Sequence, residues 1–328
     1  MRYYLLRRFL YMVILLVAVS AFSFFLIDLP PGDYLTSYVA SLRDARGADI
    51  DQAEVEALKQ QYGLDQSLGV RYVKWISNMT RGDFGRSFAY NKEVAGMIRE
   101  RIGITVFSAL LTLIFTYGVA IPIGIYSATR QYSVGDYFFT ILGFVGLAMP
   151  TFFLALVLMY YINRLTGFSV GGLYSPQFMN QPMNVAKFID MLKHIAVLVI
   201  AVGMAGTASV LRIMRSGVLD ELKKQYVISA RSKGLSEGRL LLRYPVRLAL
   251  NPIVSTIGWV LPGIVSGATV TAIVMNIPTL GALLYEALLA QDTYVAAACI
   301  MLLSFMTVVG MFVSDLLLAL VDPRIRLT

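Results

Sequence analysis

Several residue types on which enzymes and metalloproteins depend are scarce in this sequence of 328 residues. It holds one cysteine, Cys299, and one histidine, His194. One cysteine cannot form an intrachain disulfide, and one histidine with one cysteine cannot complete a zinc site. No Gly-Lys pair occurs, so the G-x-x-x-x-G-K-[ST] loop that holds nucleotide phosphates is missing. We therefore predict no cofactor or metal in this chain, and any nucleotide hydrolysis must take place elsewhere.

Charge is also scarce. Only 15% of the residues are charged and 57% are hydrophobic, with a mean hydropathy of +0.68, which excludes a soluble fold. Between the charged residues lie long neutral windows, and a helix needs roughly 20 apolar residues to cross a membrane. Five windows fit one span each: 9–27, 102–129, 137–163, 194–211 and 293–314.

A sixth window, 248–285, contains Pro252, Pro262 and Pro278, and it predicts one span followed by a re-entrant or broken outer segment. All six windows are continuously apolar, whereas barrel strands alternate. The sequence thus predicts an all-α polytopic membrane protein with about six transmembrane helices. The first window resembles a secretory signal in its flanks, but its long apolar run favours an uncleaved anchor.

Lys and Arg are distributed unevenly between the predicted loops. With the amino terminus inside, the cytoplasmic segments hold most of these residues, including nine between Arg212 and Arg247. This predicts that both termini are cytoplasmic. The net charge of +8 then mainly reflects basic residues that keep loops on the cytoplasmic side of the membrane. No nucleic-acid partner is expected. The predicted regions are a cytoplasmic amino terminus with the first span (1–29), an extracytoplasmic loop (30–101), and a five-helix core (102–328) that includes the basic segment 212–247.

The outer loop contains signals for short helices. Asp51 with Glu54 predicts a helix start and Gly63 a stop, and a second apolar stretch covers 70–79. These helices either cap the bundle or receive a soluble partner, and both roles remain open.

The basic segment 212–247 predicts two short helices. The first covers 219–233 and ends at Gly234, a residue suited to a left-handed helix end. The second begins at Ser236 as N-cap, with Glu237 in its first turn and Leu235 packing onto Leu240. Together they form a compact elbow that projects into the cytoplasm.

No acidic or basic residue lies in the middle of a predicted span, where proton- or sodium-driven transporters need one. Asp136, His194 and Asp315 lie at window ends and are interpreted as interfacial. The chain is therefore expected to lack its own energy coupling. A secondary transporter or channel working alone is the alternative from another class.

Two further motifs have a structural and a functional interpretation. Residues 167–171 match the hydrolase pattern G-x-S-x-G, with Ser169 and His194 as candidates, but the pattern follows a membrane helix and lacks an obvious carboxylate. Gly263 and Gly267 form a G-x-x-x-G pair, which predicts close helix packing and is compatible with a gate or pore wall.

Residues 226–235, Tyr-Val-Ile-Ser-Ala-Arg-Ser-Lys-Gly-Leu, resemble the cytoplasmic signature of ABC importer permeases in the form used by the oligopeptide and dipeptide branch. Other matches resemble the first permease subunit of that branch. They lie at 4–8, 31–33, 62–65, 82–87 and 322–326.

The resemblance implies a type I ABC importer permease fold and a transport subunit that is not an enzyme. It implies a second, similar permease, two ATP-binding subunits that carry ATP and Mg²⁺, and an extracytoplasmic solute-binding protein, in a bacterial or archaeal cell membrane. The elbow would be the coupling helix that meets an ATPase. Carried over by position, the ATPase-coupling residues are Tyr226, Ala230, Arg231, Lys233, Gly234 and Leu235. In this reading Gly234 makes the turn, Ala230 permits close packing, and the basic residues meet the partner.

The sequence departs from the family signature at the elbow, where Ile228 and Ser229 precede Ala230 in place of Glu-Ala. Residues 275–281 and 311–315 also differ from the usual patterns. Because relatives import oligosaccharides and other solutes as well as peptides, the solute class remains open.

Overall fold

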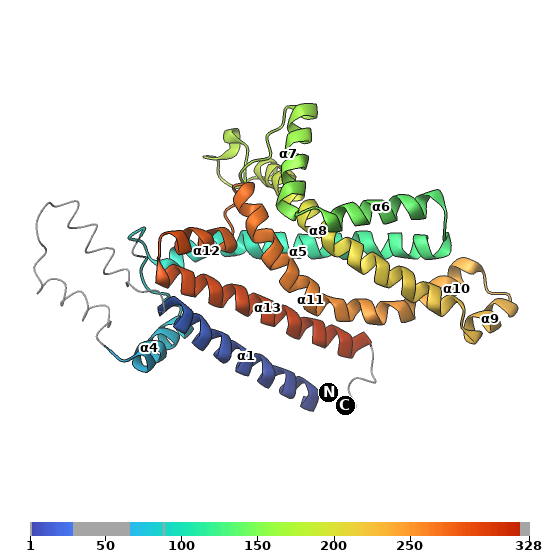
Figure 1. Ribbon diagram of the computed structural model, residues 1–328, viewed down its shortest axis with the longest axis horizontal. Coiled ribbons are helices and arrows are strands. Elements are labelled where there is room, and N and C mark those ends of the chain that lie inside the picture. The colour runs from blue at the N-terminus through green and yellow to red at the C-terminus, as the bar shows by residue number, and fades with distance from the viewer. Residues whose placement is uncertain (1, 29–65, 88, 322–328) are drawn as a thin grey trace, which may run out of the picture. The chain divides into compact units, whose positions relative to one another are not determined.

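The computed structural model describes residues 2–28, 66–87 and 89–321. In this part of the chain the regular structure is helical, apart from one isolated bridge between Arg86 and Glu93. The elements, labelled in Figure 1, are α1 (Arg2–Asp28), α4 (Leu68–Thr80), α5 (Val94–Thr129), α6 (Val134–Ala148), α7 (Thr151–Thr166), η1 (Pro176–Phe178), α8 (Val185–Leu222), α9 (Gln225–Ser232), α10 (Glu237–Arg243), α11 (Pro245–Val274), α12 (Leu280–Leu289) and α13 (Thr293–Val321).

Five stretches of helix within the described residues are long and apolar enough to cross a membrane. They are Leu6–Phe25, Val94–Thr129, Val185–Leu222, Glu237–Val274 and Thr293–Ala319. The bent pair of α6 and α7 makes a sixth if it counts as one span. The all-α polytopic fold and the expectation of about six spans are therefore confirmed.

The third predicted span, 137–163, is wrong as a single helix. It consists of the end of α6 and most of α7, which are bent by 113° relative to each other. The cause is Pro150. The residue before a proline avoids the α-helical region, and Met149 is accordingly extended with φ −91° and ψ 132°.

The sixth window breaks as expected. α11 runs through Pro252 and Pro262 to Val274, and the chain then turns through Asn276, which has a left-handed φ of 55°. After Pro278, the short apolar helix α12 follows. The predicted break into one span and a separate short segment is confirmed, whereas the outer position of that segment stays a prediction.

Of the two helices expected in the outer loop, the one over 51–63 lies outside the described residues. The other is present as α4, which extends the predicted stretch slightly at both ends. Its aromatic side chains pack against α1: Tyr72 hydrogen-bonds Ser20 at 2.6 Å, and the rings of Tyr72 and Trp75 both contact Phe24. Burial of these rings is what places α4 on α1.

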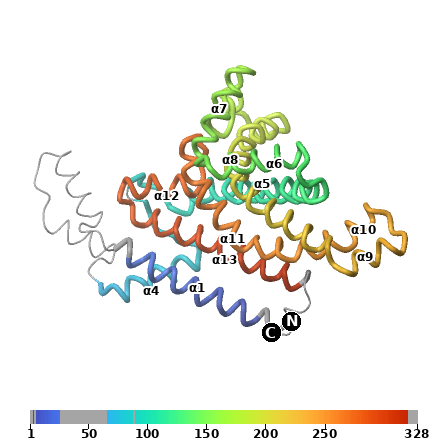
Figure 2. The backbone as a smooth tube through the Cα atoms, turned by 45° about the vertical axis from the view of Figure 1, so that its right-hand side comes forward, coloured from blue at the N-terminus to red at the C-terminus, as the bar shows by residue number. Residues whose placement is uncertain are grey.

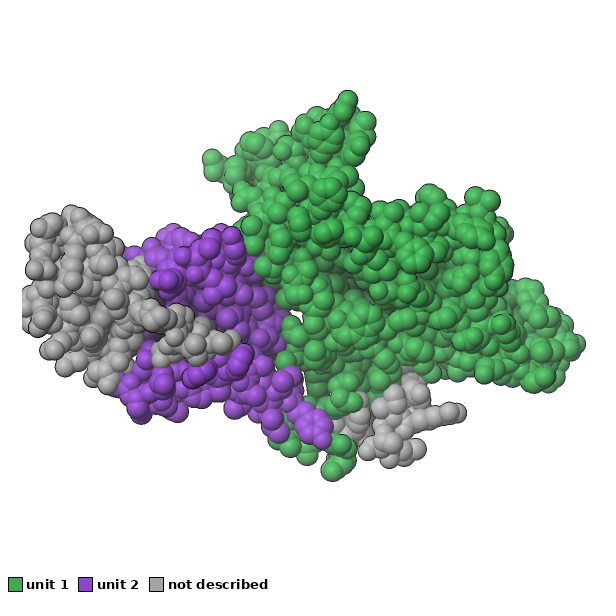
Figure 3. All heavy atoms as spheres, in the orientation of Figure 1, with its two compact units in different colours: residues 1–10, 104–278, 307–328 green, residues 11–103, 279–306 purple. Residues whose placement is uncertain are grey.

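The contacts divide the chain into two compact units, coloured separately in Figure 3. Unit 1 comprises residues 1–10, 104–278 and 307–328, and unit 2 comprises 11–103 and 279–306. The division into regions 1–29, 30–101 and 102–328 stays a prediction, because it concerns sides of a membrane and not compactness.

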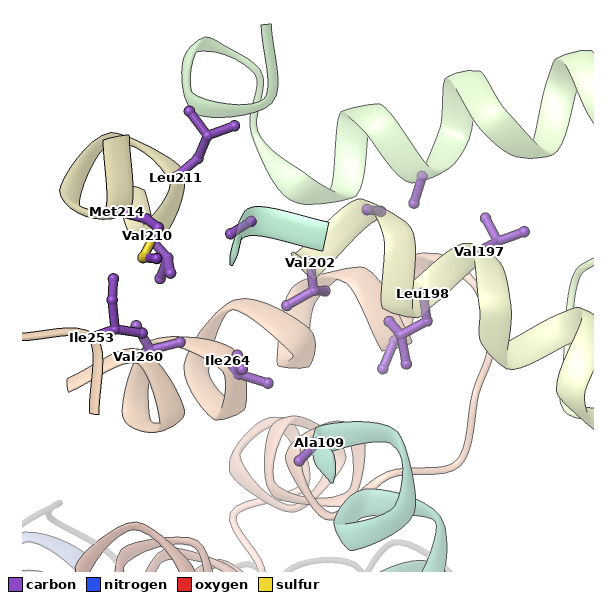
Figure 4. Close-up of a cluster of buried hydrophobic side chains, with 14 of the residues drawn as sticks. Ala109, Val197, Leu198, Val202, Val210, Leu211, Met214, Ile253, Val260 and Ile264 are labelled. Atoms are coloured by element: carbon purple, nitrogen blue, oxygen red, sulfur yellow. The ribbon is translucent and has the colours of Figure 1, made fainter. Parts of the chain in front are cut away.

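The core of unit 1 is organised around α8, which packs against α6, α7 and α11. Figure 4 shows side chains of α8, among them Val202, Val210 and Met214, next to Ile253 and Val260 of α11. In the apolar window of α8, 67% of the residues are buried, against 11% in α1. α8 is therefore the central helix of its unit, and it leads directly into the basic segment 212–247.

Close helix approach occurs at glycines other than the predicted pair. A Cβ on Gly203 of α8 would lie 2.5 Å from the ring of Phe115 on α5, so nothing larger than glycine fits there. A Cβ on Gly263 would meet no atom within 4 Å among the described residues, and one on Gly267 would come no closer than 3.9 Å to Val202. Close packing at Gly263 and Gly267 is therefore not found among the described residues of this chain, because Gly263 lies on the exposed side of α11.

Unit 2 has its own apolar core, formed by the start of α5, α12 and the first half of α13, and it includes Cys299. Beside this core, the fully buried carboxylate of Asp292 accepts hydrogen bonds from Ser87 Oγ (2.6 Å) and from the backbone N–H groups of Ala89 (3.2 Å) and Val295 (3.3 Å). The bond to Val295 caps the amino end of α13. Residues 82–87, noted for their resemblance, are thereby held at the start of α13.

Candidate functional site

The short helices α9 and α10 connect the ends of α8 and α11. We call residues 223–244 the elbow. Figures 1 and 2 both show it beyond the ends of α8 and α11, so that it projects from unit 1. Most of its side chains are exposed. It therefore presents a surface that is physically continuous with the central helix α8.

Gly234 ends α9 with a complete left-handed helix cap. Its φ is +78°, its N–H donates to the carbonyl of Arg231 (3.0 Å), and the N–H of Leu235 donates to the carbonyl of Ala230 (3.4 Å). These two bonds are the pair that defines a Schellman motif, in which glycine is favoured because it has no Cβ to clash. The prediction that Gly234 makes the turn is confirmed.

The predicted first helix, 219–233, is wrong in its extent. α8 continues to Leu222, and the chain leaves the helical conformation at Lys224, where ψ is 147°, before α9 begins at Gln225. The break turns the chain so that Val227 is fully buried against Leu240. Tertiary burial of an apolar side chain has overridden the local preference for a continuous helix.

A small apolar cluster holds the two helices of the elbow together. Its buried members are Val227, Ala230 and Leu240, with Leu235 and Tyr244 packed against them. The expected contact between Leu235 and Leu240 is therefore present. The small side chain of Ala230, 7% exposed, is the one that α9 presents to this cluster, which agrees with its predicted role in close packing.

The outer surface of the elbow carries its polar contacts. Arg231 makes a two-bond ion pair with Glu237 across the glycine turn, at 2.5 and 3.0 Å. Tyr226 donates its hydroxyl to Glu221 at the end of α8, and burial together with this carboxylate raises the pKa of Tyr226 well above its usual range. Ser236 stands at the N-cap of α10, but its side chain does not form the predicted capping bond. The ion pair between Glu237 and Arg231 instead holds the start of α10 against the end of α9.

The structure thus divides the six predicted coupling residues into two groups. Ala230 and Leu235 point into the elbow's own cluster, whereas the other four, Tyr226, Arg231, Lys233 and Gly234, are exposed. Sequence reasoning missed Val227, Glu221 and Tyr244, which hold the elbow together. The i, i+3 spacing of Val227 and Ala230 was the available signal. A pair such as Arg231 and Glu237, six residues apart across a turn, follows no helical spacing rule.

A second polar site lies where α6 meets α8. The carboxylate of Asp136, almost fully buried, receives two hydrogen bonds from the guanidinium of Arg215, at 3.1 and 2.8 Å, and one from the backbone N–H of Tyr132 at 3.0 Å. A two-bond Arg–carboxylate pair fixes orientation as well as distance. It links α6 to α8 about two turns before the elbow, so movement at the elbow can reach α6.

The hydrolase alternative is tested by the surroundings of His194. Its Nδ1 lies 3.0 Å from the carbonyl oxygen of Gly172, and its Nε2 lies 3.3 Å from Ser175 Oγ, not beside Ser169. Asp190 accepts bonds from both the N–H and the hydroxyl of Ser175, each at 2.7 Å. A catalytic triad needs the carboxylate on the histidine Nδ1 and an accessible serine. Here all three side chains are buried and hold the loop before α8.

The chain was also compared with known proteins. Residues 120–327 match the family model described as binding-protein-dependent transport system inner membrane component. Residues 1–109 match the model described as the N-terminal part of such membrane components. Together the two matches cover nearly the whole chain.

Relatives match over their full length. The oligopeptide transport system permease protein AppB of Bacillus subtilis (strain 168) is 32% identical over 325 residues, which is 98% of this chain and 99% of the relative. The dipeptide transport system permease protein DppB of Lactococcus lactis subsp. cremoris (strain MG1363) is 27% identical over 99% of both chains. The nickel import system permease protein NikB of Staphylococcus aureus (strain MRSA252) is 26% identical over 98% of this chain and 92% of the relative. The chain therefore belongs to the family of binding-protein-dependent transport system inner membrane components, and it is a multi-pass permease of the cell membrane in an ABC importer.

Proposed function

We propose that this permease forms half of the translocation path of a peptide importer and that its elbow receives the movement of an ATP-binding subunit. The observation that carries the proposal is the geometry at Gly234. A short exposed helix is closed by a left-handed glycine, tied internally by apolar contacts, and joined to the most buried helix of unit 1. Such an element moves as a rigid body, so a force applied to its surface is transmitted to α8.

The residues of the elbow then have distinct roles. Tyr226, Arg231 and Lys233 present polar and basic groups to an ATPase surface, and Gly234 sets the direction of the chain between α9 and α10. Ala230 and Leu235 keep the two helices together from inside. In this assignment the elbow is cytoplasmic, as are both termini, because the nine basic residues from Arg212 to Arg247 favour that side.

The proposed assembly contains a second, homologous permease, two ATP-binding subunits and an extracytoplasmic solute-binding protein in a lipid bilayer. This chain binds no nucleotide, and ATP with Mg²⁺ belongs to the ATP-binding subunits. No nucleic acid takes part. The family implies such partners in general, and the arrangement of two different but similar permeases is our specific proposal.

Peptides are the proposed solutes. Relatives that match over the full chain are named for oligopeptide and dipeptide transport. Another relative is named for nickel import, and other members of this branch carry oligosaccharides, so the solute is best tested directly. Uptake assays should compare short peptides, nickel ions and oligosaccharides at equal concentrations.

The experiment that tests the proposed function is reconstitution of the complete complex in liposomes. We expect ATP hydrolysis to be stimulated by the solute-loaded binding protein, and uptake of a labelled peptide to depend on ATP. The control contains this chain alone with the same peptide gradient, where no uptake is expected. Uptake by the chain alone without ATP would instead support a secondary transporter or channel and would refute the proposal.

A further inference from the structure

One face of α11 is exposed along its whole length in unit 1. The exposed residues recur every three or four positions and therefore form a single stripe on the helix. We call this stripe the α11 face. Its members are Leu248, Pro252, Ser255, Trp259, Gly263, Ser266 and Val270.

The α11 face differs in chemistry from other exposed helix faces in unit 1. The exposed face of α5 presents Val106, Leu110 and Ile114 together with Gly103 and Gly118, and so carries neither a hydroxyl group nor an indole. Such a face is suited to lipid tails, which have no polar groups to offer. The α11 face also has apolar members, but it adds two serine hydroxyl groups and an indole N–H, and these polar groups favour a surface that meets water or polar groups.

Trp259 is the most informative member of the α11 face. It lies at the middle of α11 and 54% of it is exposed, whereas tryptophans that face lipid gather at the two ends of a span, where the indole N–H reaches the interface. Within the described residues the indole N–H has no hydrogen-bond partner. An unpaired donor in hydrocarbon is costly, so this position indicates polar surroundings at mid-membrane depth.

The rotation of α11 is set by contacts on its opposite side. Thr256 hydrogen-bonds Tyr117 of α5 at 2.7 Å, and Thr271 contacts Thr151 at the start of α7 at 2.9 Å. These bonds hold α11 at two points along its length. The α11 face is therefore directed away from α5 and α7 by specific polar contacts.

The serines of the α11 face are only weakly engaged. Ser255 and Ser266 donate to carbonyls of their own helix at 3.4 and 3.5 Å, which is long for a hydroxyl donor. Between Trp259 and Ser266, Gly263 leaves open space, with no atom of the described chain within 4 Å of an added Cβ. Gly263 is thus an open position without a side chain, which lies along the helix between an indole and a hydroxyl group.

From these observations we infer that the α11 face lines the solute path, and that Trp259 and Ser266 contact the solute on either side of Gly263. The inference rests on the proposed function and adds the residues that touch the solute. A neutral wall of hydroxyl and indole groups suits a peptide, whose amides exchange hydrogen bonds with it. The members of the α11 face include no charged side chain, so none of them would hold a charged peptide terminus in place.

The first test is the accessibility of single cysteines in the complete complex in liposomes. The only thiol of this chain is removed by Cys299→Ala, labelling is measured on this chain alone, and Ser266→Cys is compared with the control Ile114→Cys on the exposed face of α5. A charged methanethiosulfonate reagent is the probe. Because the reagent needs water and a thiolate, we expect Ser266→Cys to react at least about tenfold faster than the control.

Protection provides the second readout of this test. Excess peptide with its binding protein and ATP should slow labelling of Ser266→Cys and leave the control unchanged. Equal labelling rates at the two positions would overturn the inference. So would a spontaneous disulfide to a cysteine scanned along the second permease, because that would place the α11 face in a subunit interface.

The second test adds a large side chain at Gly263. Gly263→Leu is matched by Gly118→Leu on α5, since both glycines are exposed and neither would meet an atom within 4 Å of an added Cβ. We expect Gly263→Leu to reduce peptide uptake at least about tenfold, while Gly118→Leu keeps it. ATPase stimulation by the binding protein should persist in both variants. Normal uptake in Gly263→Leu would refute the path assignment, and loss of ATP-dependent uptake in the unsubstituted complex would refute the proposed function itself.

Discussion

At the scale of single residues, Gly234 gives the sharpest prediction. A β-branched residue at a φ of +78° costs at least about 1 to 2 kcal/mol, because its Cβ crowds the following carbonyl oxygen. We expect Gly234→Val to distort the cap of α9 and to uncouple ATP hydrolysis from uptake, with insertion into the membrane intact. The measurement is the ratio of peptide imported to ATP hydrolysed in liposomes.

Two control variants separate backbone strain from bulk at the elbow. Gly234→Asn should retain much of the coupling, since asparagine tolerates the left-handed region. Gly238→Val adds the same side chain at an exposed helical glycine of α10, where an added Cβ meets no atom within 4 Å, and should be nearly neutral. Equal coupling ratios in Gly234→Val and Gly238→Val would contradict the assigned role of the turn.

Asp292 gives a second prediction at this scale, for stability. Its removal in Asp292→Ala leaves Ser87 Oγ and two backbone N–H groups without their acceptor, and each unsatisfied buried donor costs about 1 to 3 kcal/mol. We expect the unfolding temperature of unit 2 to fall clearly. Cys299 lies in the core of this unit, so a thiol-reactive fluorophore added during heating reports its exposure directly.

The matched control for this stability test is Asp83→Ala. Asp83 accepts a bond from the N–H of Gly85 at 2.9 Å, but it does so on the surface. Its removal should shift the unfolding temperature little, because water replaces the lost partner. A similar shift in the two variants would mean that burial of Asp292 is not what stabilises the start of α13.

At the scale of elements, the ion pair between Asp136 and Arg215 joins α6 to α8. The pair predicts strong coupling in a double-mutant cycle of alanine substitutions, about 1 to 3 kcal/mol in unfolding free energy, since Arg215→Ala leaves the Asp136 carboxylate, only 4% exposed, without its charge partner. Arg215→Lys should be intermediate, because an ammonium group cannot form the two-bond fork. Uptake per ATP hydrolysed is the functional readout, as the pair connects α6 to the helix that enters the elbow.

The chain contains a comparison pair for this cycle. Arg8 and Asp315 lie 3.0 Å apart, but their side chains are 42% and 27% exposed. Neither partner is as buried as Asp136, so coupling between these two partly exposed side chains is expected to be only about 0 to 1 kcal/mol. If the cycle at Asp136 and Arg215 were additive within the error of the comparison pair, the mechanical link between α6 and α8 would be rejected.

At this scale, the sequence predicted which helices exist, but it predicted only some of the places where the helices break. The long apolar windows predicted the spans, and Gly234 predicted the end of α9 because glycine alone relieves the steric clash of a left-handed residue. The break before α9 has no such local cause. It exists because Val227 gains burial against Leu240, a contact between two helices that no local pattern encodes.

At the scale of the whole molecule, two of the exposed surfaces of unit 1 are assigned a function. One is the elbow, with Tyr226, Arg231 and Lys233 on its outside, and the other is the α11 face around Trp259. α8 packs against α11 and continues into the elbow, so a movement of the elbow is passed to the helix that carries the α11 face. The reconstitution experiment and the cysteine test together examine both surfaces in the assembled importer.

The sequence by itself determined the class of this protein. Its apolar windows require helices in a membrane, because unpaired backbone groups are not tolerated in hydrocarbon, and the basic segment with its glycine predicted the elbow. Only the tertiary structure decided which side of α11 is exposed, that Asp136 pairs with Arg215, and that His194 is a buried loop anchor. These features depend on residues far apart in the chain, and their pairing is set by packing rather than by local conformational preference.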